Sequence, residues 1–166
     1  MIKTYSLNQK VVHCREGLCV IFSETTINGN EYFVVKSTTG SGENIYVLKT
    51  KTENIIRPLM SVEEAKEIIK YMNSVEAEFI NNTKQRRDIY KRKLGSGNVM
   101  DLAYLAKQLF LFHYLNAKGT VVKLGPTDIE MLQNADKILF DEMSLVFNIN
   151  NDEIKPFLIK KYNLIY

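Results

Sequence analysis

A dense group of basic residues lies in the segment NNTKQRRDIYKRKLGSGN, from Asn81 to Asn98. Its cations are Lys84, Arg86, Arg87, Lys91, Arg92 and Lys93. Asp88 is the one acidic residue in the segment, so few ion pairs within a helix are available to these cations. Such a cluster suits a polyanion, either the phosphates of a nucleic-acid backbone or an acidic protein surface. A solvated helix surface is the alternative.

The same segment has the pattern of a helix that stops at a glycine hinge. At about 100° per residue, Lys84, Arg87 and Lys91 follow one face, while Arg86 and Lys93 point nearer another. The run Gly95–Gly97 can end this helix, and Asn98 can cap the next one.

Residue types that serve catalysis or metal binding are sparse elsewhere. His13, Cys14 and Cys19 are close in sequence, but a structural zinc site needs four ligands and the other histidine, His113, is distant. Alternation along a strand also separates His13 from Cys14, which argues against a Cys–His nucleophile pair. We therefore expect a protein that is not an enzyme, with no catalytic residue, no metal, no cofactor and no small-molecule substrate. An enzyme acting on nucleic acid is the rival interpretation, and it would need clustered acids or metal ligands.

The first third of the chain has the pattern of short strands. Runs rich in Val, Ile, Tyr and Phe predict strands at residues 10–13, 18–24, 31–36 and 44–49. Asn28-Gly29 predicts a tight hairpin turn, because a type I′ turn needs positive φ at both central residues. Several short strands this close together suggest a small barrel.

The composition changes after Pro58, and helical signals follow. Ser61 and Glu64 have the spacing of a capping box, and Thr127 with Glu130 repeats it after Pro126. We therefore expect an α+β fold in which a β module, residues 1–60, precedes an all-helical module, residues 61–166.

The composition of the whole chain narrows the class of protein. The chain has 166 residues, 45% hydrophobic residues and a formal net charge of +3, so it is long enough for a packed core and nearly neutral. Two cysteines are too few for a disulfide-rich secreted scaffold. The N-terminus has no apolar signal core, and no apolar run approaches the roughly 18 residues of a membrane span. We expect a soluble cytoplasmic protein without membrane partners.

A series of short motifs resembles a known family. The motifs are Val11-Val12-His13, Gly17, Cys19-Val20-Ile21, Tyr32 to Lys36 (YFVVK), Ile56 to Ser61 (IRPLMS), Leu94 to Asn98 (LGSGN), and Asp128 to Leu132 with Ala135 and Leu139. Together and in this order they resemble the CarD/CdnL-type bacterial transcription regulators, whose N-terminal module is shared with transcription-repair coupling factors. The resemblance covers nearly the whole chain.

The resemblance implies a non-enzymatic adaptor with two partners. A Tudor/SH3-like β-barrel would dock on the β subunit of RNA polymerase, and the helical module would touch promoter DNA near the upstream edge of the transcription bubble. The polymerase contacts expected on this basis are Thr25, Glu43, Ile45, Tyr46 and Val47. The expected DNA contacts, mainly to phosphates, are Lys84, Arg86, Arg87, Lys91, Arg92 and Lys93.

Two departures from the family pattern bear on the DNA contact. Many members carry a tryptophan wedge where this chain has Thr83, and the chain contains no tryptophan. Phe79, Tyr90 or nothing takes its place. Leu111-Phe112 stands where the family usually has arginines. A protein-only adaptor with little or no DNA contact is therefore the alternative function. The sequence is compatible with an activator or a repressor, with any set of promoters, and with a monomer or a dimer.

Overall fold

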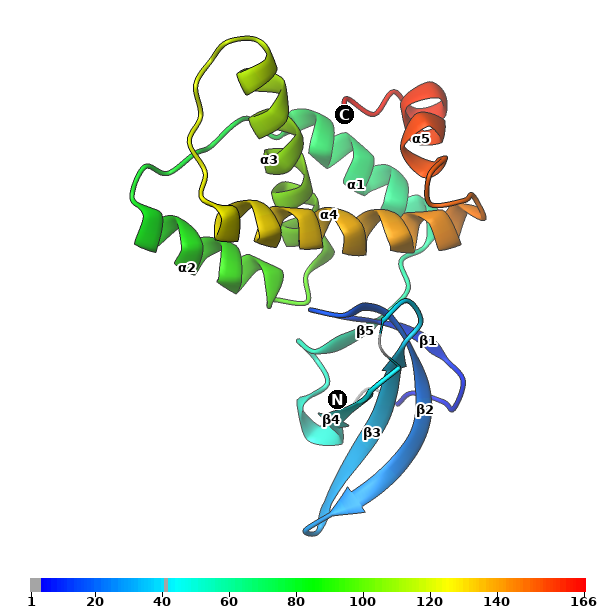
Figure 1. The fold of residues 1–166 in the computed structure, drawn as a ribbon. Coiled ribbons are helices and arrows are strands. Elements are labelled where there is room, and N and C mark those ends of the chain that lie inside the picture. The colour runs from blue at the N-terminus through cyan, green and yellow to red at the C-terminus, as the bar shows by residue number, and fades with distance from the viewer. Residues whose placement is uncertain (1–3, 41) are drawn as a thin grey trace.

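The computed structural model describes residues 4–40 and 42–166 and places a β-sheet against a layer of helices (Figure 1). The strands are β1 (Lys10–His13), β2 (Gly17–Ile27), β3 (Asn30–Ser37), β4 (Asn44–Leu48) and β5 (Ile56–Pro58), with the short 3-10 helix η1 (Lys49–Lys51) before β5. The helices are α1 (Val62–Ser74), α2 (Thr83–Leu94), α3 (Val99–Ala117), α4 (Pro126–Phe147) and α5 (Ile154–Tyr162). Strands precede helices, so the expected α+β fold is confirmed.

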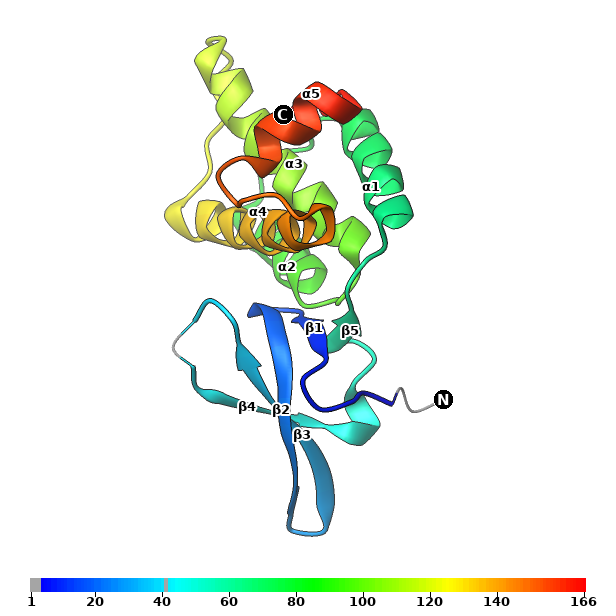
Figure 2. The ribbon, with the colours of Figure 1, turned by 90° about the vertical axis from the view of Figure 1, so that its right-hand side faces the viewer.

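The five strands form one antiparallel sheet in the order β4-β3-β2-β1-β5. Strands β4 and β5 lie at its two edges and do not pair with each other in the described part of the chain. The expected small barrel is therefore present only as an open, barrel-like sheet. The β2–β3 hairpin projects away from the helices in both views (Figures 1 and 2).

Turn chemistry sets the register of that hairpin. Asn28 and Gly29 have φ angles of 51° and 78°, as the predicted type I′ turn requires. Strand β5 was not predicted, because its three residues are too few to show alternation. Pro58 is tolerated there because β5 is an edge strand. No described strand pairs with its outer side, so the missing N–H of proline removes no hydrogen bond on that side.

The inner face of the sheet has its own apolar core. Its buried side chains are Tyr5, Val11, Cys19, Ile21, Phe33, Val35, Val47 and Ile56. The outer face meets α4 at one end, where Val12 and Leu18 pack with Ile138. Gly17, at φ 72°, lies so close that an added Cβ would stand 3.3 Å from the Ile138 side chain. The sheet and the helices therefore share a packed junction.

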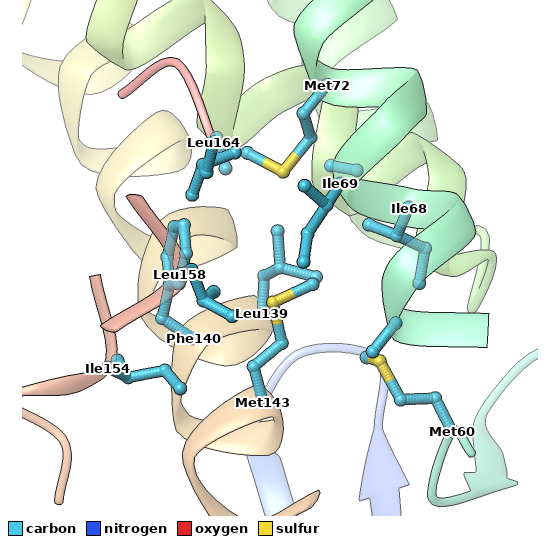
Figure 3. Packing of buried hydrophobic residues seen from close by; sticks show 13 residues of the cluster. Met60, Ile68, Ile69, Met72, Leu139, Phe140, Met143, Ile154, Leu158 and Leu164 are labelled. Atoms are coloured by element: carbon cyan, nitrogen blue, oxygen red, sulfur yellow. The ribbon is translucent and has the colours of Figure 1, made fainter. Parts of the chain in front are cut away.

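A second core joins helices α1, α4 and α5 to the C-terminal tail. Figure 3 shows Met72 of α1, Leu139 of α4 and Leu158 of α5 converging with Leu164 of the C-terminal tail. The predicted capping box begins α1, because Ser61 Oγ accepts from the Glu64 N–H at 3.1 Å and Glu64 Oε2 accepts from the Ser61 N–H at 2.6 Å.

The start of α4 lies earlier than the sequence pattern predicted. Pro126 is the first helical residue and Gly125 precedes it, so Asp128, three residues after Gly125, takes the capping position expected for Glu130. Asp128 Oδ2 accepts the Gly125 N–H at 3.0 Å. Proline favours the first helical position because its missing N–H would have no partner there. At this capping position Asp128 is fully buried.

Candidate functional site

The predicted basic helix is α2, which packs against α3 and α4. Asn82 begins it, with its Oδ1 atom accepting from the Gln85 N–H at 2.9 Å. The helix ends as expected at Gly95, whose N–H donates to the Lys91 carbonyl, and Gly97 at φ 71° turns the chain toward α3. An added Cβ on Gly97 would stand 2.9 Å from the Asn54 carbonyl oxygen, so the hinge needs glycine for space as well as conformation.

Four of the six basic side chains of α2 lie on its outward side, in contact with solvent. Lys84, Lys91 and Arg92 are exposed and make no ion pair with any described residue. Arg87 is half-buried, and its Nε lies 3.4 Å from Asp128 Oδ1. The exposed Asp88 shares this surface. The uncompensated positive charge of α2 is thus concentrated on its outward side.

Arg86 has a different place. Its side chain is 5% exposed and donates to Asp128 Oδ2 and to the Ile80 carbonyl, both at 2.6 Å. Burial alone would raise the pKa of Asp128, but the Arg86 hydrogen bond, the Gly125 N–H and the charges of Arg86 and Arg87 together hold it below its usual value. Arg86 therefore joins α2 to the start of α4 and does not face outward with the other cations.

Lys93 is also engaged within the protein. Its Nζ lies 2.7 Å from Asp101 Oδ1 and 4.6 Å from the centre of the Tyr104 ring. Both partners are on α3, so Lys93 ties the end of α2 to that helix. The sequence had placed Arg86 and Lys93 away from the main cationic face, and the structure gives each of them an internal partner.

The two aromatic residues considered for the wedge position differ in accessibility. Tyr90 is 1% exposed and lies in the core between α2, α3 and α4, where burial raises its pKa to about 12. Phe79 is half-buried and lines a cavity of about 470 Å³ together with Thr83, Arg86 and Val121. Only Phe79 of the two therefore lies beside Thr83 near the surface.

The residues expected to contact polymerase lie on both sides of β3. Glu43 and Tyr46 are exposed at edge strand β4, Ile45 is half-buried, and Val47 is 1% exposed because its side chain belongs to the sheet core. Thr25 of β2 pairs with Tyr32 of β3 and is half-exposed.

Strands β2 and β4 each have a stretch of edge that pairs with no described strand. β1 pairs with β2 at residues 17–20, and beyond Ile21 no described strand pairs with that side of β2. The outer edge of β4 is likewise unpaired in the described sheet. A segment of another protein can add to such an edge.

Sequence reasoning missed the exposed aromatic side chain of Phe22, which follows Ile21 in β2. The register shifts between Ile21 and Ser23, so Phe22 is an extra residue in the strand. A bulge of this kind adds one residue and shifts the alternation by one, so that Ser23 lies opposite Val34 and Glu24 opposite Phe33. The adjacent apolar pair Ile21-Phe22 was the one available signal.

The cysteine and histidine residues of the sheet have structural surroundings. Burial raises the pKa of the Cys19 thiol to about 11, and both cysteines are free. His13 Nδ1 accepts the N–H groups of Arg15 and Glu16, each at 3.2 Å, which fixes the β1–β2 turn. Across residues 4–40 and 42–166, no three His, Cys, Asp or Glu side chains gather as metal ligands, and none of the helices has the length and hydropathy to cross a membrane.

Comparison with known proteins identifies the helical part. Residues 67–158, more than half of the chain, match the family model described as "CarD, C-terminal domain", and the sheet lies outside the matched range. No curated protein matches the chain. The match covers α2, α3 and α4 completely and includes the cations of α2 and their partner Asp128. This chain belongs to the CarD family, and it is a CarD-like, transcription-related protein.

Proposed function

We propose that this protein regulates transcription by docking on the β subunit of RNA polymerase and contacting promoter DNA near the upstream edge of the bubble. In this proposal the sheet module, residues 1–60, holds the polymerase, and the helical module, residues 61–166, approaches the DNA. Membership of a transcription-related family supports the proposal. So does the division of the chain into a sheet with open edges and a helix with an unpaired cationic face.

The observation that carries the DNA contact is the outward surface of α2. Lys84, Lys91 and Arg92 are exposed without an acidic partner in the described chain, and Arg87 lies beside them. Their role is to bind phosphates, which gives binding that depends weakly on sequence and strongly on salt. Arg86 and Lys93, which have internal partners, hold this surface in place.

The polymerase contact in the proposal uses the edges of the sheet. An extended segment of the β subunit would add to β4, so that main-chain hydrogen bonds supply affinity and alternating side chains supply selectivity. Glu43, Ile45 and Tyr46 flank that edge, Val47 contributes through its main chain, and Thr25 lies on the open side of β2.

The proposal is tested by the lifetime of polymerase–promoter complexes with the full chain present. A variant with Lys84, Lys91 and Arg92 all replaced by alanine is compared with a control in which the exposed Lys51, Lys70 and Lys160 are replaced, since both lose three charges. The proposal expects the first variant to lose the effect on lifetime while its affinity for polymerase is unchanged. An effect that survives in the first variant would contradict the DNA contact.

The second candidate function is a protein-only adaptor on the polymerase. It is favoured by one observation: Thr83 cannot act as an aromatic wedge, and Tyr90 is buried in the core. In the same experiment this candidate expects both triple variants to behave like the unmodified protein. Phe79→Ala separates the cases further, because it weakens the promoter complex only if Phe79 takes over the wedge position beside Thr83.

A further inference from the structure

The outer face of the sheet is covered by α4 at one end and exposed over the rest of its length. At the covered end, Val12 and Leu18 pack under Ile138. Farther from the helices, Phe22 is 53% exposed and Tyr46 is 51% exposed. About half of each of these large apolar side chains is therefore open to solvent.

Strand register places the neighbours of these two rings on the same face. Tyr46 is directly opposite Val34, and Val34 is opposite Ser23, the residue after Phe22. Lys36 is opposite Val20, which is in turn opposite Lys10, so both lysines extend from this face. The Lys36 Nζ atom lies 3.6 Å from the centre of the Phe22 ring, which confirms that the bulged residue points the same way.

The charges on this face have one sign. The nearby acids Glu24 and Glu31 are on the other side of the sheet, since Glu24 is opposite the core residue Phe33. There they bind Lys49, with Nζ–Oε distances of 2.7 and 3.4 Å. No side chain of the described strands on the outer face is acidic. Among the described strand residues of this face, the charged neighbours of the exposed aromatic pair are lysines.

We propose that Phe22 and Tyr46, bordered by Lys10 and Lys36, bind an apolar surface patch of RNA polymerase that is edged with carboxylates. This inference rests on the proposed polymerase docking and adds to it the chemistry of the partner surface. A few residues near the centre of a contact dominate the energy of protein interfaces, where aromatic side chains are enriched, and charges at the rim steer association. The patch lies on the same face of the sheet as Val12 and Leu18, beyond the end that α4 covers.

A protein partner fits this face better than a single-stranded nucleic acid. Bases can stack on exposed rings, but that mode of binding also needs a groove of cations that follows the phosphates. Here two lysines border the rings, and Lys36 is stacked on one of them. The nucleic-acid alternative is an outcome of the test below.

The test measures the affinity of full-length variants for core RNA polymerase from the same source. Phe22→Ala is expected to raise the Kd at least tenfold, while Phe22→Tyr, which keeps the ring, stays within about threefold. Lys36→Glu is expected to weaken binding mainly through a slower association rate at low salt. Ile165→Ala is the matched control, because Ile165 is 57% exposed and belongs to the C-terminal tail of the helical module.

The outcomes separate this inference from the proposed function. If the unmodified protein fails to bind core polymerase, the proposed docking is wrong and this inference falls with it. If the unmodified protein binds and both Phe22→Ala and Lys36→Glu match the Ile165→Ala control, docking stands and this inference is overturned. Loss of binding to a labelled single-stranded oligonucleotide in Phe22→Ala, with polymerase affinity unchanged, would also overturn it. Thermal melting of each variant shows whether its fold is intact. If Phe22→Ala unfolds, the affinity of Lys36→Glu for core polymerase decides the test.

Discussion

Arg57 and Glu142 form a two-point ion pair between β5 and α4. The distances are 2.7 Å for Nη1–Oε1 and 2.6 Å for Nη2–Oε2, and Glu142 is fully buried. The same carboxylate accepts the Met60 N–H at 2.7 Å. One acidic side chain of the longest helix thus joins that helix to the last strand and to the junction after it.

Replacing one member of this pair is expected to be costly. Glu142→Leu leaves the Arg57 guanidinium and the Met60 N–H unpaired at a buried junction, which we expect to lower the free energy of unfolding by about 3–5 kcal/mol. The double variant Arg57→Met/Glu142→Leu removes both charges and is expected to recover much of that loss. Urea denaturation measures both. A single variant that loses less than about 1 kcal/mol would show that the pair is not a structural joint.

Arg86 and Lys84 are predicted to differ although both belong to the basic cluster. Arg86→Ala leaves Asp128 buried without its closest cation and is expected to cost about 3–5 kcal/mol of stability. Lys84→Ala on the exposed side is expected to stay within about 0.5 kcal/mol. Thermal and chemical unfolding of both variants test this. An Arg86→Ala protein with unchanged stability and weakened DNA binding would reassign Arg86 to the interface.

His13 is expected to make stability depend on pH in the mildly acidic range. Burial lowers its pKa below the ordinary value of 6.5. Two smaller effects are that the charge of Glu16 raises this pKa and the charge of Arg15 lowers it. The unfolded chain therefore binds a proton more readily than the folded protein. The contribution is constant above about pH 7, and the free energy of unfolding falls as pH drops below about 6.5, by at most about 1.4 kcal/mol per pH unit.

Denaturation between pH 5 and 7.5 measures this slope. His13→Asn removes the titrating group but keeps an oxygen that can accept from the Arg15 and Glu16 N–H groups, so the slope is expected to disappear. His113→Asn, at an exposed position, controls for the loss of an imidazole. An unchanged slope in His13→Asn would mean that another group causes it.

Binding of the protein to duplex DNA is expected to depend steeply on salt. Four phosphate contacts, by Lys84, Arg87, Lys91 and Arg92, give a slope of about −3 to −4 for log K against log salt concentration. Removing Lys91 is expected to make the slope shallower by about one. Fluorescence anisotropy over a range of salt concentrations checks this, with Lys70→Ala as the control. Equal slopes for Lys91→Ala and Lys70→Ala would exclude Lys91 from the interface.

Local signals predicted most of the elements. Asn28-Gly29 determined the hairpin and the Ser61–Glu64 spacing determined the start of α1, because each depends on residues within one turn. The start of α4 differs from the expectation because Pro126 is the first helical residue, whereas the Thr127–Glu130 spacing predicts a start after the proline. Closure of the sheet could not be predicted, since it depends on whether β4 and β5 meet, and they lie at opposite edges.

The roles of the individual cations depended on tertiary contacts. Helical spacing separated Arg86 from Lys84, Arg87 and Lys91, but its partner Asp128 is 42 residues away in sequence and is positioned by the packing of α2 on α4. The exposed Phe22 depends on a bulge, for which the adjacent apolar pair Ile21-Phe22 was the one signal in the sequence. Sequence thus located the cationic helix and the sheet, and packing selected which of their side chains reach solvent.

The central claim, docking on RNA polymerase, is tested most directly by calorimetric titration of the full chain against core RNA polymerase from the same source. The account predicts saturable one-to-one binding, with the same stoichiometry in the Lys84, Lys91 and Arg92 triple variant. No heat of binding at protein concentrations of about 100 μM, corresponding to an affinity weaker than roughly −5.5 kcal/mol, would contradict it.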